Sequence, residues 1–156
     1  MADVTVSNSP ALVGTTRNVE AQEKGVTSVP FYWTANGHTV SASSIIFLAK
    51  IPHGAHITRL AGAIWVGNAD NSTVDMGLTG EASLDYLVDG LAVSATATTA
   101  IAVRTGALPH FVSLSDDTQP RFRYLQAKIA SLGTATTTAI ISGVIEYVMG
   151  KPTIGN

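Results

Sequence analysis

Two histidines, His53 and His56, stand three residues apart in the segment His53-Gly-Ala-His56. Imidazole nitrogens are common ligands of zinc and other transition metals, so this pair is the first candidate for a metal site. The segment reads as a turn leading into a strand, where the two side chains need not converge, and no carboxylate is near in sequence. We therefore interpret both histidines as solvated or interface-lining residues and predict no metal.

Oxygen-bearing side chains gather at Asn68, Asp70, Asn71 and Asp75, and such oxygens are the ligands that calcium prefers. Their spacing matches no defined calcium loop, and Asn and Asp are also ordinary turn residues. The segment Gly77-Leu-Thr-Gly80 is too short for a phosphate-binding loop and lacks its lysine. With no convincing nucleophile, acid–base pair or ligand cluster, the sequence predicts no cofactor and no enzymatic activity.

The two tryptophans, Trp33 and Trp65, are the remaining candidates for ligand binding, because an indole ring can stack on a sugar. Both lie inside apolar runs. We favour packing in the core or at a protein interface for both residues, and we keep a carbohydrate-binding platform as the alternative.

The charge content argues in the same direction. Nine basic and eleven acidic residues give a net charge of −2, and no stretch clusters Lys and Arg, so nucleic acid is not a predicted partner. Only 13% of residues are charged, against about 25% in an ordinary soluble domain. Charge depletion is typical of surfaces buried against other proteins, although a neutral surface rich in Ser, Thr and Ala has the same composition. The chain has no cysteine, so disulfides do not stabilise it.

The ends of the chain give expectations about location. The first ten residues lack the basic start and apolar stretch of a secretory signal, so we expect synthesis in a cytoplasm. The most apolar late segment, residues 139–149, is about half the length of a membrane span and contains Glu146, which argues against a transmembrane helix.

We expect the candidate residues of the domain to lie on β-strands and the turns between them. The chain is predicted to have three regions: an extended N-terminal arm at 1–25, a β-sandwich domain at 26–150 and a C-terminal tail at 151–156. The arm has no sustained period of 2 or 3.6. It is either a disordered terminus or a segment that pairs with the sheet edge of a neighbouring molecule. For the second alternative the candidate interface residues of the arm are Val4, Val6, Leu12 and Val13. Trp33 and Trp65 are the candidate interface residues of the domain.

Within the domain, Asn36-Gly37 between the runs 26–35 and 38–51 predicts a hairpin, since both central residues of a type I′ turn need positive φ. Pro30 predicts an edge strand or a bulge in the first run. Gly62 predicts a bulge or a bend in a long strand over 56–67.

Further strands are predicted at 73–78, 123–129 and 139–149. In the last two, Leu125, Ala127 and Ile129 share one face, as do Ile141, Ile145, Tyr147 and Met149. The spacing of Leu84, Leu87 and Val88 predicts one or two helical turns within 79–90. Short strands joined by Gly, Asn, Asp and Pro turns are typical of an antiparallel β-sandwich, and we expect one of jelly-roll type.

The run from Trp33 to Leu60, continuing through Ile64-Trp-Val-Gly67, resembles small structural proteins encoded near the capsid gene of tailed bacteriophages. The matched pattern is an apolar strand ending in Lys50-Ile-Pro-His-Gly54, followed by a strand that closes on Gly67. This resemblance covers roughly residues 30–80 and identifies no diagnostic motif. It implies a head decoration, or cement, protein: a β-rich dimer or trimer on the capsid exterior that binds the major capsid protein and bridges its subunits.

The predicted function is therefore a virion structural protein on the outside of the capsid, forming homo-oligomers and binding neither nucleic acid nor membrane. The alternative is a carbohydrate-binding β-sandwich of a head fibre or tail, in which Trp33, Trp65 and the loop at 68–75 would form the site.

Overall fold

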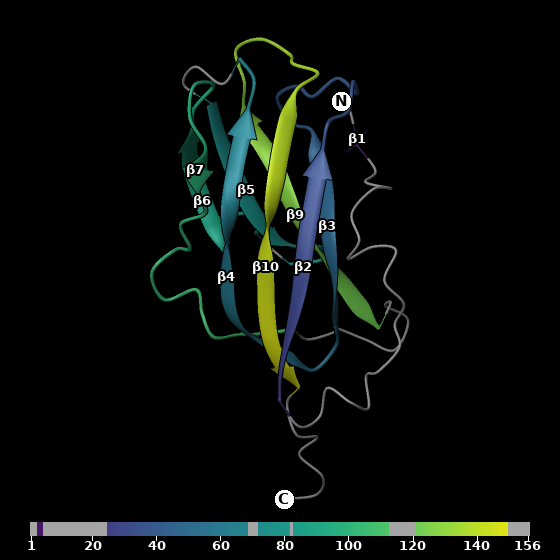
Figure 1. Cartoon of the computed structure of the whole chain (residues 1–156). Helices are drawn as coiled ribbons and strands as arrows, with labels where there is room; N and C mark the ends of the chain where they lie inside the picture. The colour runs from purple at the N-terminus through teal and green to yellow at the C-terminus, as the bar shows by residue number, and fades with distance from the viewer. Residues whose placement is uncertain (1–2, 5–24, 69–71, 82, 113–120, 150–156) are drawn as a thin grey trace, which may run out of the picture.

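A computed structural model of the chain describes residues 3–4, 25–68, 72–81, 83–112 and 121–149. These residues contain no helix and form two sheets packed face to face, which confirms the predicted β-sandwich; its jelly-roll subtype stays a prediction (Figure 1). The strands are β1 (Asp3–Val4), β2 (Val26–Thr34), β3 (Ile45–Pro52), β4 (Ala55–Val66), β5 (Ser72–Leu78), β6 (Val88–Val93), β7 (Thr99–Ala100), β8 (His110–Phe111), β9 (Phe122–Ser131) and β10 (Ala139–Met149).

Sheet A has the strand order β1-β3-β9-β5-β6, and sheet B has the order β2-β10-β4-β7, with β8 pairing β4 as well. Except for the parallel pair of β1 and β3, the pairings are antiparallel. In Figure 1, β10 lies at the front between β2 and β4. The successive strands β2, β3, β4 and β5 alternate between the sheets, so most of each sheet is built from segments distant in sequence.

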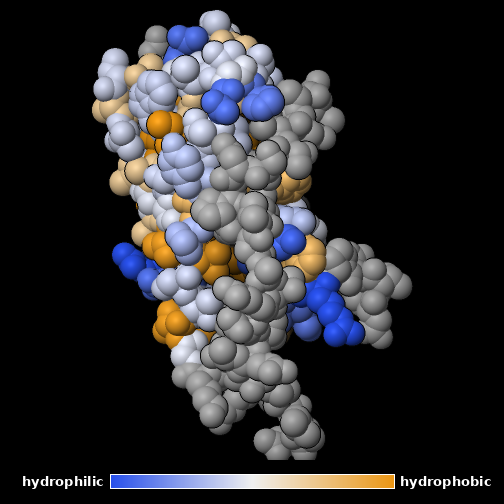
Figure 2. All heavy atoms as spheres, turned by 45° about the vertical axis from the view of Figure 1, so that its right-hand side comes forward, coloured by the Kyte–Doolittle hydropathy of each residue, from blue (hydrophilic) through white to orange (hydrophobic). Residues whose placement is uncertain are grey.

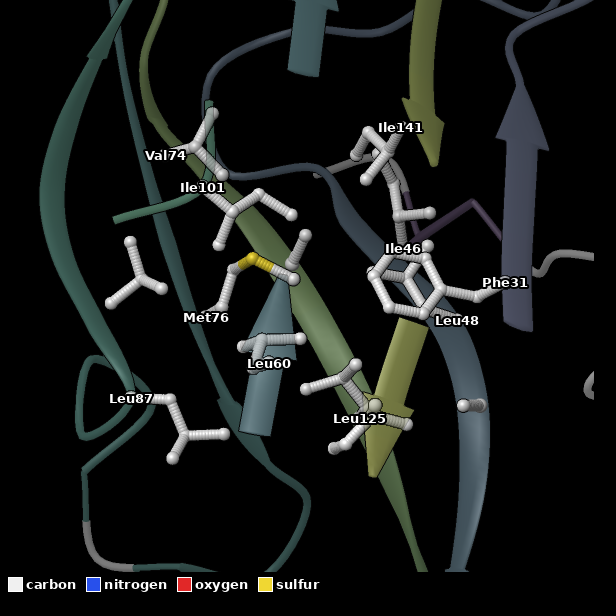
Figure 3. Packing of buried hydrophobic residues seen from close by; sticks show 14 of the residues in the cluster. Phe31, Ile46, Leu48, Leu60, Val74, Met76, Leu87, Ile101, Leu125 and Ile141 are labelled. Carbon is white, nitrogen blue, oxygen red and sulfur yellow. The ribbon is translucent and has the colours of Figure 1, made fainter. Parts of the chain in front are cut away.

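The core lies between the two sheets. Burial alternates along β9, where Leu125, Ala127 and Ile129 are each 0% exposed, as their shared face predicts. On β10, Ile141, Ile145 and Tyr147 are likewise buried. Figure 3 shows side chains from both sheets converging in this space; among the labelled ones are Phe31, Leu60 and Ile141 from sheet B and Ile46, Met76 and Leu125 from sheet A. Burying each aliphatic side chain of this size contributes roughly 1.5–3 kcal/mol.

The Asn36-Gly37 turn forms as predicted, but the predicted hairpin does not. Both residues have positive φ, 47° and 87°, and the His38 N–H donates to the Ala35 carbonyl at 2.8 Å. However, β2 pairs with β10 while β3 pairs with β9. The apolar faces of β2 and β3 oppose each other across the core, so the chain crosses from one sheet to the other after the turn. The prediction that Pro30 marks an edge strand is confirmed, since β2 ends sheet B.

The predicted helical turns within 79–90 are wrong. The described part of this segment consists of turns and bends before β6 begins at Val88. Its hydrogen bonds are tertiary: the Leu87 N–H donates to the Met76 carbonyl at 3.0 Å, and Arg123 Nη1 donates to the Thr79 carbonyl at 2.6 Å. These contacts place Leu87 in the core at 0% exposure, and they replace the local hydrogen bonds that a helix would need.

The bulge predicted at Gly62 is also wrong. The register of β4 against β10 shifts at Thr58, which has no partner between the pairs Ile57–Tyr147 and Arg59–Glu146. Gly62 instead lies directly opposite Gly143. A Cβ atom on Gly143 would lie 2.7 Å from the Phe31 ring and 2.9 Å from the Gly62 Cα, and would also clash with the Ala61 carbonyl. Glycine here allows a close approach of main chain and ring rather than a bend.

No helix among the described residues is long and apolar enough to span a membrane.

Replacing Gly143 by alanine is expected to destabilise the sandwich by about 1–3 kcal/mol, because the added methyl group overpacks against the β4 main chain. The measurement is thermal and denaturant unfolding of Gly143→Ala beside Gly133→Ala, a glycine whose added Cβ would meet nothing within 4 Å. Equal midpoints for the two variants would show that the close approach at Gly143 is not required.

Candidate interaction surface

The candidate interaction surface is the face of sheet B that points away from sheet A. We call it the outer face of sheet B. Successive side chains of a strand point to opposite faces. The side chains of Phe31 and Trp33 on β2, and of Ile141 and Ile145 on β10, point into the core, so the residues between them point outward. The outward residues are Val26, Ser28, Pro30, Tyr32 and Thr34 on β2, Ile140, Ser142, Val144, Glu146 and Val148 on β10, and His56, Arg59, Ala61, Ala63 and Trp65 on β4.

Exposed apolar side chains concentrate on this face. Five large hydrophobic side chains of the described residues are exposed, and four of them lie here: Val26 at 61%, Tyr32 at 45%, Ile140 at 37%, and Phe111 of β8, which pairs with His56, at 47%. Figure 2, in which the front of Figure 1 is turned to the left, shows apolar side chains at several heights along that side. Exposed apolar side chains that gather on one face are typical of protein-binding surfaces.

The outward residues of this face include one Arg and one Glu, so the face has no net charge when His56 is neutral. Arg59 Nη1 lies 3.1 Å from Glu146 Oε1, and the Ser28 hydroxyl donates to the same oxygen at 3.4 Å. The Arg59 side chain is 59% exposed, so the ion pair contributes little to stability. Its importance is that the face presents no unpaired Arg or Glu charge to a partner, and an unpaired charge is costly to desolvate.

A hollow of about 370 Å³ lies at one end of the outer face of sheet B. Its lining is uncharged and combines one aromatic ring with small apolar residues and hydroxyls: Ala63, Trp65, Thr96, Ala97, Thr98, Ile140 and Ser142. The Trp65 Nε1–H donates to the Ala95 carbonyl at 2.9 Å, which fixes the ring against the segment that forms the rim. The hollow suits a partly apolar, neutral group with a polar end.

The outer face of sheet A has a different chemistry. Phe47, Phe122 and Tyr124 form a half-buried aromatic cluster, with ring centroids 5.2 Å apart for Phe47–Tyr124 and 5.3 Å for Phe122–Tyr124. Lys50 Nζ lies 4.9 Å from the centroid of the Phe122 ring. Lys128 and Asp75 are paired in register farther along this sheet. Each outer face therefore has one register pair of opposite charges, and the outer face of sheet A has Lys50 in addition.

The two histidines are placed around an aromatic ring. The centroids of the His53 and His56 rings lie 6.5 Å and 4.8 Å from that of Phe111. Among the described residues no group of three or more His, Asp or Glu side chains is arranged to hold a metal ion.

The oxygen-bearing side chains at 68–75, for which the sequence predicts no metal, are only partly described. Asp70 and Asn71 lie outside the described residues. Asp75 accepts a hydrogen bond from the Gly90 N–H at 2.8 Å, and Asn68 has a φ of 60°. Asp75 thus links β5 to β6, and Asn68 has the left-handed backbone conformation of a turn residue.

The sequence-predicted interface residues are scattered. Trp33 is 2% exposed in the core, whereas Trp65 is half-buried at the hollow. Val4 lies in β1, opposite Ile46 at the edge of sheet A. Val6, Leu12 and Val13 lie outside the described residues. The structure thus places Trp65 alone of the described candidates on the outer face of sheet B.

No protein-family model and no curated protein matches the sequence. The structure is similar to a chain of the capsid of Ralstonia phage GP4, with a TM-score of 0.66 and 18% identity, covering 97% of this chain and 100% of the other. The two chains share a fold. A chain of the cyanophage Pam1 capsid asymmetric unit has a TM-score of 0.49 and 12% identity, covering 81% of this chain and 87% of that one. The likeness to the GP4 chain extends over the whole sandwich.

The sequence analysis missed Tyr32, Ile140, Val144 and Val148 as surface residues. The signal was present in β10, where both alternating faces carry β-branched residues and only Ser142 and Glu146 mark the second face as outward. A strand that is apolar on both faces indicates burial on both faces, or an outer face that meets a partner.

Replacing Trp65 by phenylalanine is expected to lower the free energy of unfolding by about 0.5–1.5 kcal/mol, because the ring stays but the hydrogen bond to Ala95 is lost. Amide hydrogen exchange over 95–100 is expected to accelerate in the same variant. Unchanged exchange there would contradict the role of the Trp65 N–H in fixing the rim of the hollow.

Proposed function

We propose that this protein is a structural component of a bacteriophage virion, bound to the capsid exterior, where it bridges and stabilises neighbouring capsid subunits. The observation that carries the proposal is the likeness, complete over both chains, to a chain of the GP4 capsid. The neutral, apolar outer face of sheet B supports it independently, because this surface suits contact with other proteins. Synthesis in the host cytoplasm and the major capsid protein as partner are parts of the same proposal.

The mechanism we propose is a clamp made of several weak contacts. An oligomer that touches more than one capsid subunit gains effective concentration at each further contact, so modest individual affinities add up to durable attachment. The outer face of sheet B is the proposed contact with other virion subunits. Because Arg59 and Glu146 pair with each other, no unpaired Arg or Glu charge has to be desolvated there. Val4 pairs with Ile46 of the same chain, so the proposed second contact is the N-terminal segment after β1, with Val6, Leu12 and Val13, by strand addition to a neighbouring sheet edge.

A carbohydrate-binding module is the second candidate, and the hollow beside Trp65 favours it. An indole ring flanked by the hydroxyls of Thr96, Thr98 and Ser142 is suitable chemistry for a neutral sugar. The burial of Trp33 reduces this candidate to a site with a single tryptophan. Saturable quenching of Trp65 fluorescence by a neutral oligosaccharide, lost in Trp65→Phe, would favour it over the proposal that the protein bridges capsid subunits.

The test of the proposed surface is a lysine in the centre of each outer face. Val144→Lys in β10, the middle of sheet B, is expected to weaken co-sedimentation with capsids that lack this protein by at least about ten-fold, because the added charge must be desolvated. The matched control is Gln126→Lys in β9, the middle of sheet A, where the same change is expected to leave binding intact. The reverse result would assign the contact to sheet A.

The contribution of the N-terminal segment is tested by deleting residues 1–24. The deletion is expected to preserve the thermal unfolding midpoint within a few degrees, because the described core lies in residues 26–149. Binding to capsids is expected to weaken, since the contacts made by the segment are lost. If the truncated protein binds capsids undiminished, the segment has no part in attachment.

A further inference from the structure

We propose that the outer face of sheet B docks a second copy of this chain, about a two-fold axis that runs along β10. In this arrangement Tyr32 of each copy enters the Trp65 hollow of the other. The inference builds on the proposed function, which assigns this face to contact between virion subunits, and it names the occupant.

The strand order supplies the symmetry. Tyr32 on β2 and Ala63 on β4 are both register partners of Ser142 on β10. They therefore lie at the same height on opposite sides of the central strand, each about 4.8 Å from it. A two-fold rotation about a line along β10 exchanges the two sides. It brings Tyr32 of one copy over Ala63 of the other, and the reciprocal contact forms at the same time.

The chemistry of the two contact sites matches. Tyr32 is 45% exposed and projects outward, although its neighbours Phe31 and Trp33 are buried. Ala63 is part of the lining of the hollow, which is uncharged and carries hydroxyl groups. A tyrosine combines a flat apolar ring with a polar end, so the ring can pack on Trp65 while the hydroxyl reaches a Thr or Ser oxygen. Tyrosine inserted in a pocket is a common source of affinity at protein interfaces.

The charges and the edges of sheet B favour this face-to-face arrangement. The ion pair Arg59–Glu146 leaves the face neutral, and it lies four residues along β10 from Ser142, about 13 Å from the centre of the proposed contact. Edge-to-edge pairing is disfavoured, because Pro30 removes a main-chain donor from β2 and β7 at the opposite edge spans only Thr99–Ala100.

The first experiment compares two exposed tyrosines by sedimentation equilibrium of the full chain. Tyr32→Ala is expected to raise the dimer dissociation constant by about thirty-fold or more, as for an interface hot spot. Tyr86→Ala is the matched control, since Tyr86 is also exposed, at 37%, but stacks on His110 away from this face. A wild-type protein that stays monomeric, or equal effects of the two variants, would overturn the proposal.

The second experiment uses the absence of cysteine from the chain. Pro30 and Ala61 flank Val144 as Tyr32 and Ala63 flank Ser142, so a mixture of Pro30→Cys and Ala61→Cys proteins keeps Tyr32 and the lining of the hollow. Treated with a short bismaleimide, this mixture is expected to give a cross-linked dimer. Any link between the two variants joins different molecules, so an intramolecular product cannot imitate it. Two copies of the same single variant place their thiols on opposite sides of the axis and are expected to link poorly. Preferential 30–30 linkage, or no linkage, would contradict the two-fold along β10.

Capsid co-sedimentation in parallel separates this inference from the proposed function. If Tyr32→Ala leaves self-association unchanged but abolishes capsid binding, the face meets the capsid, and the inference is overturned while the function stands. If the mixed cross-link forms but the wild-type protein does not bind capsids, the inference stands and the function is overturned.

Discussion

The pairing of β10 with both β2 and β4 is the interaction on which sheet B depends. These two pairings run along nearly all of β10, and they join residues 26–34 and 55–66 through a strand that begins at residue 139. The Gly62–Gly143 contact lies at the centre of the pairing with β4, with the Phe31 ring beside it. The outer face of sheet B exists only because β10 brings the outward residues of three strands into common rows.

The two outer faces of the sandwich carry out different physical tasks. Sheet A exposes an aromatic cluster with Lys50 beside it and the charges of Lys128 and Asp75, so water can solvate it. Sheet B exposes apolar and hydroxyl-bearing side chains, and its Arg59 and Glu146 neutralise each other. Each face thus has one pair of opposite charges in register, and the faces differ in Lys50 on sheet A and in the exposed Tyr32 and Ile140 on sheet B.

The features predicted correctly from the sequence are those that depend on local chemistry. Positive φ at Asn36 and Gly37, the edge position of Pro30 and the buried faces of β9 and β10 follow from residue type and from a period of two. Pairing partners do not follow, because the choice of β10 over β3 as neighbour of β2 is decided across the core, between residues more than 100 positions apart. The segment 79–90 shows the same limit: tertiary hydrogen bonds from Arg123 and Leu87 overrode its helical spacing. The site was partly predictable, since Trp65 was a candidate. The outward position of Tyr32 could be assigned only from the register of β2 against β10.

The late position of β10 has a consequence for synthesis of the protein. Translation proceeds from the N-terminus, so β2 and β4 leave the ribosome long before the strand that joins them. Until residue 149 emerges, the main-chain groups of β2 and β4 that face β10 have no partner strand. Pairing between different nascent chains then competes with correct folding. The proline in β2, which removes a donor from that waiting strand, limits this competition during the interval.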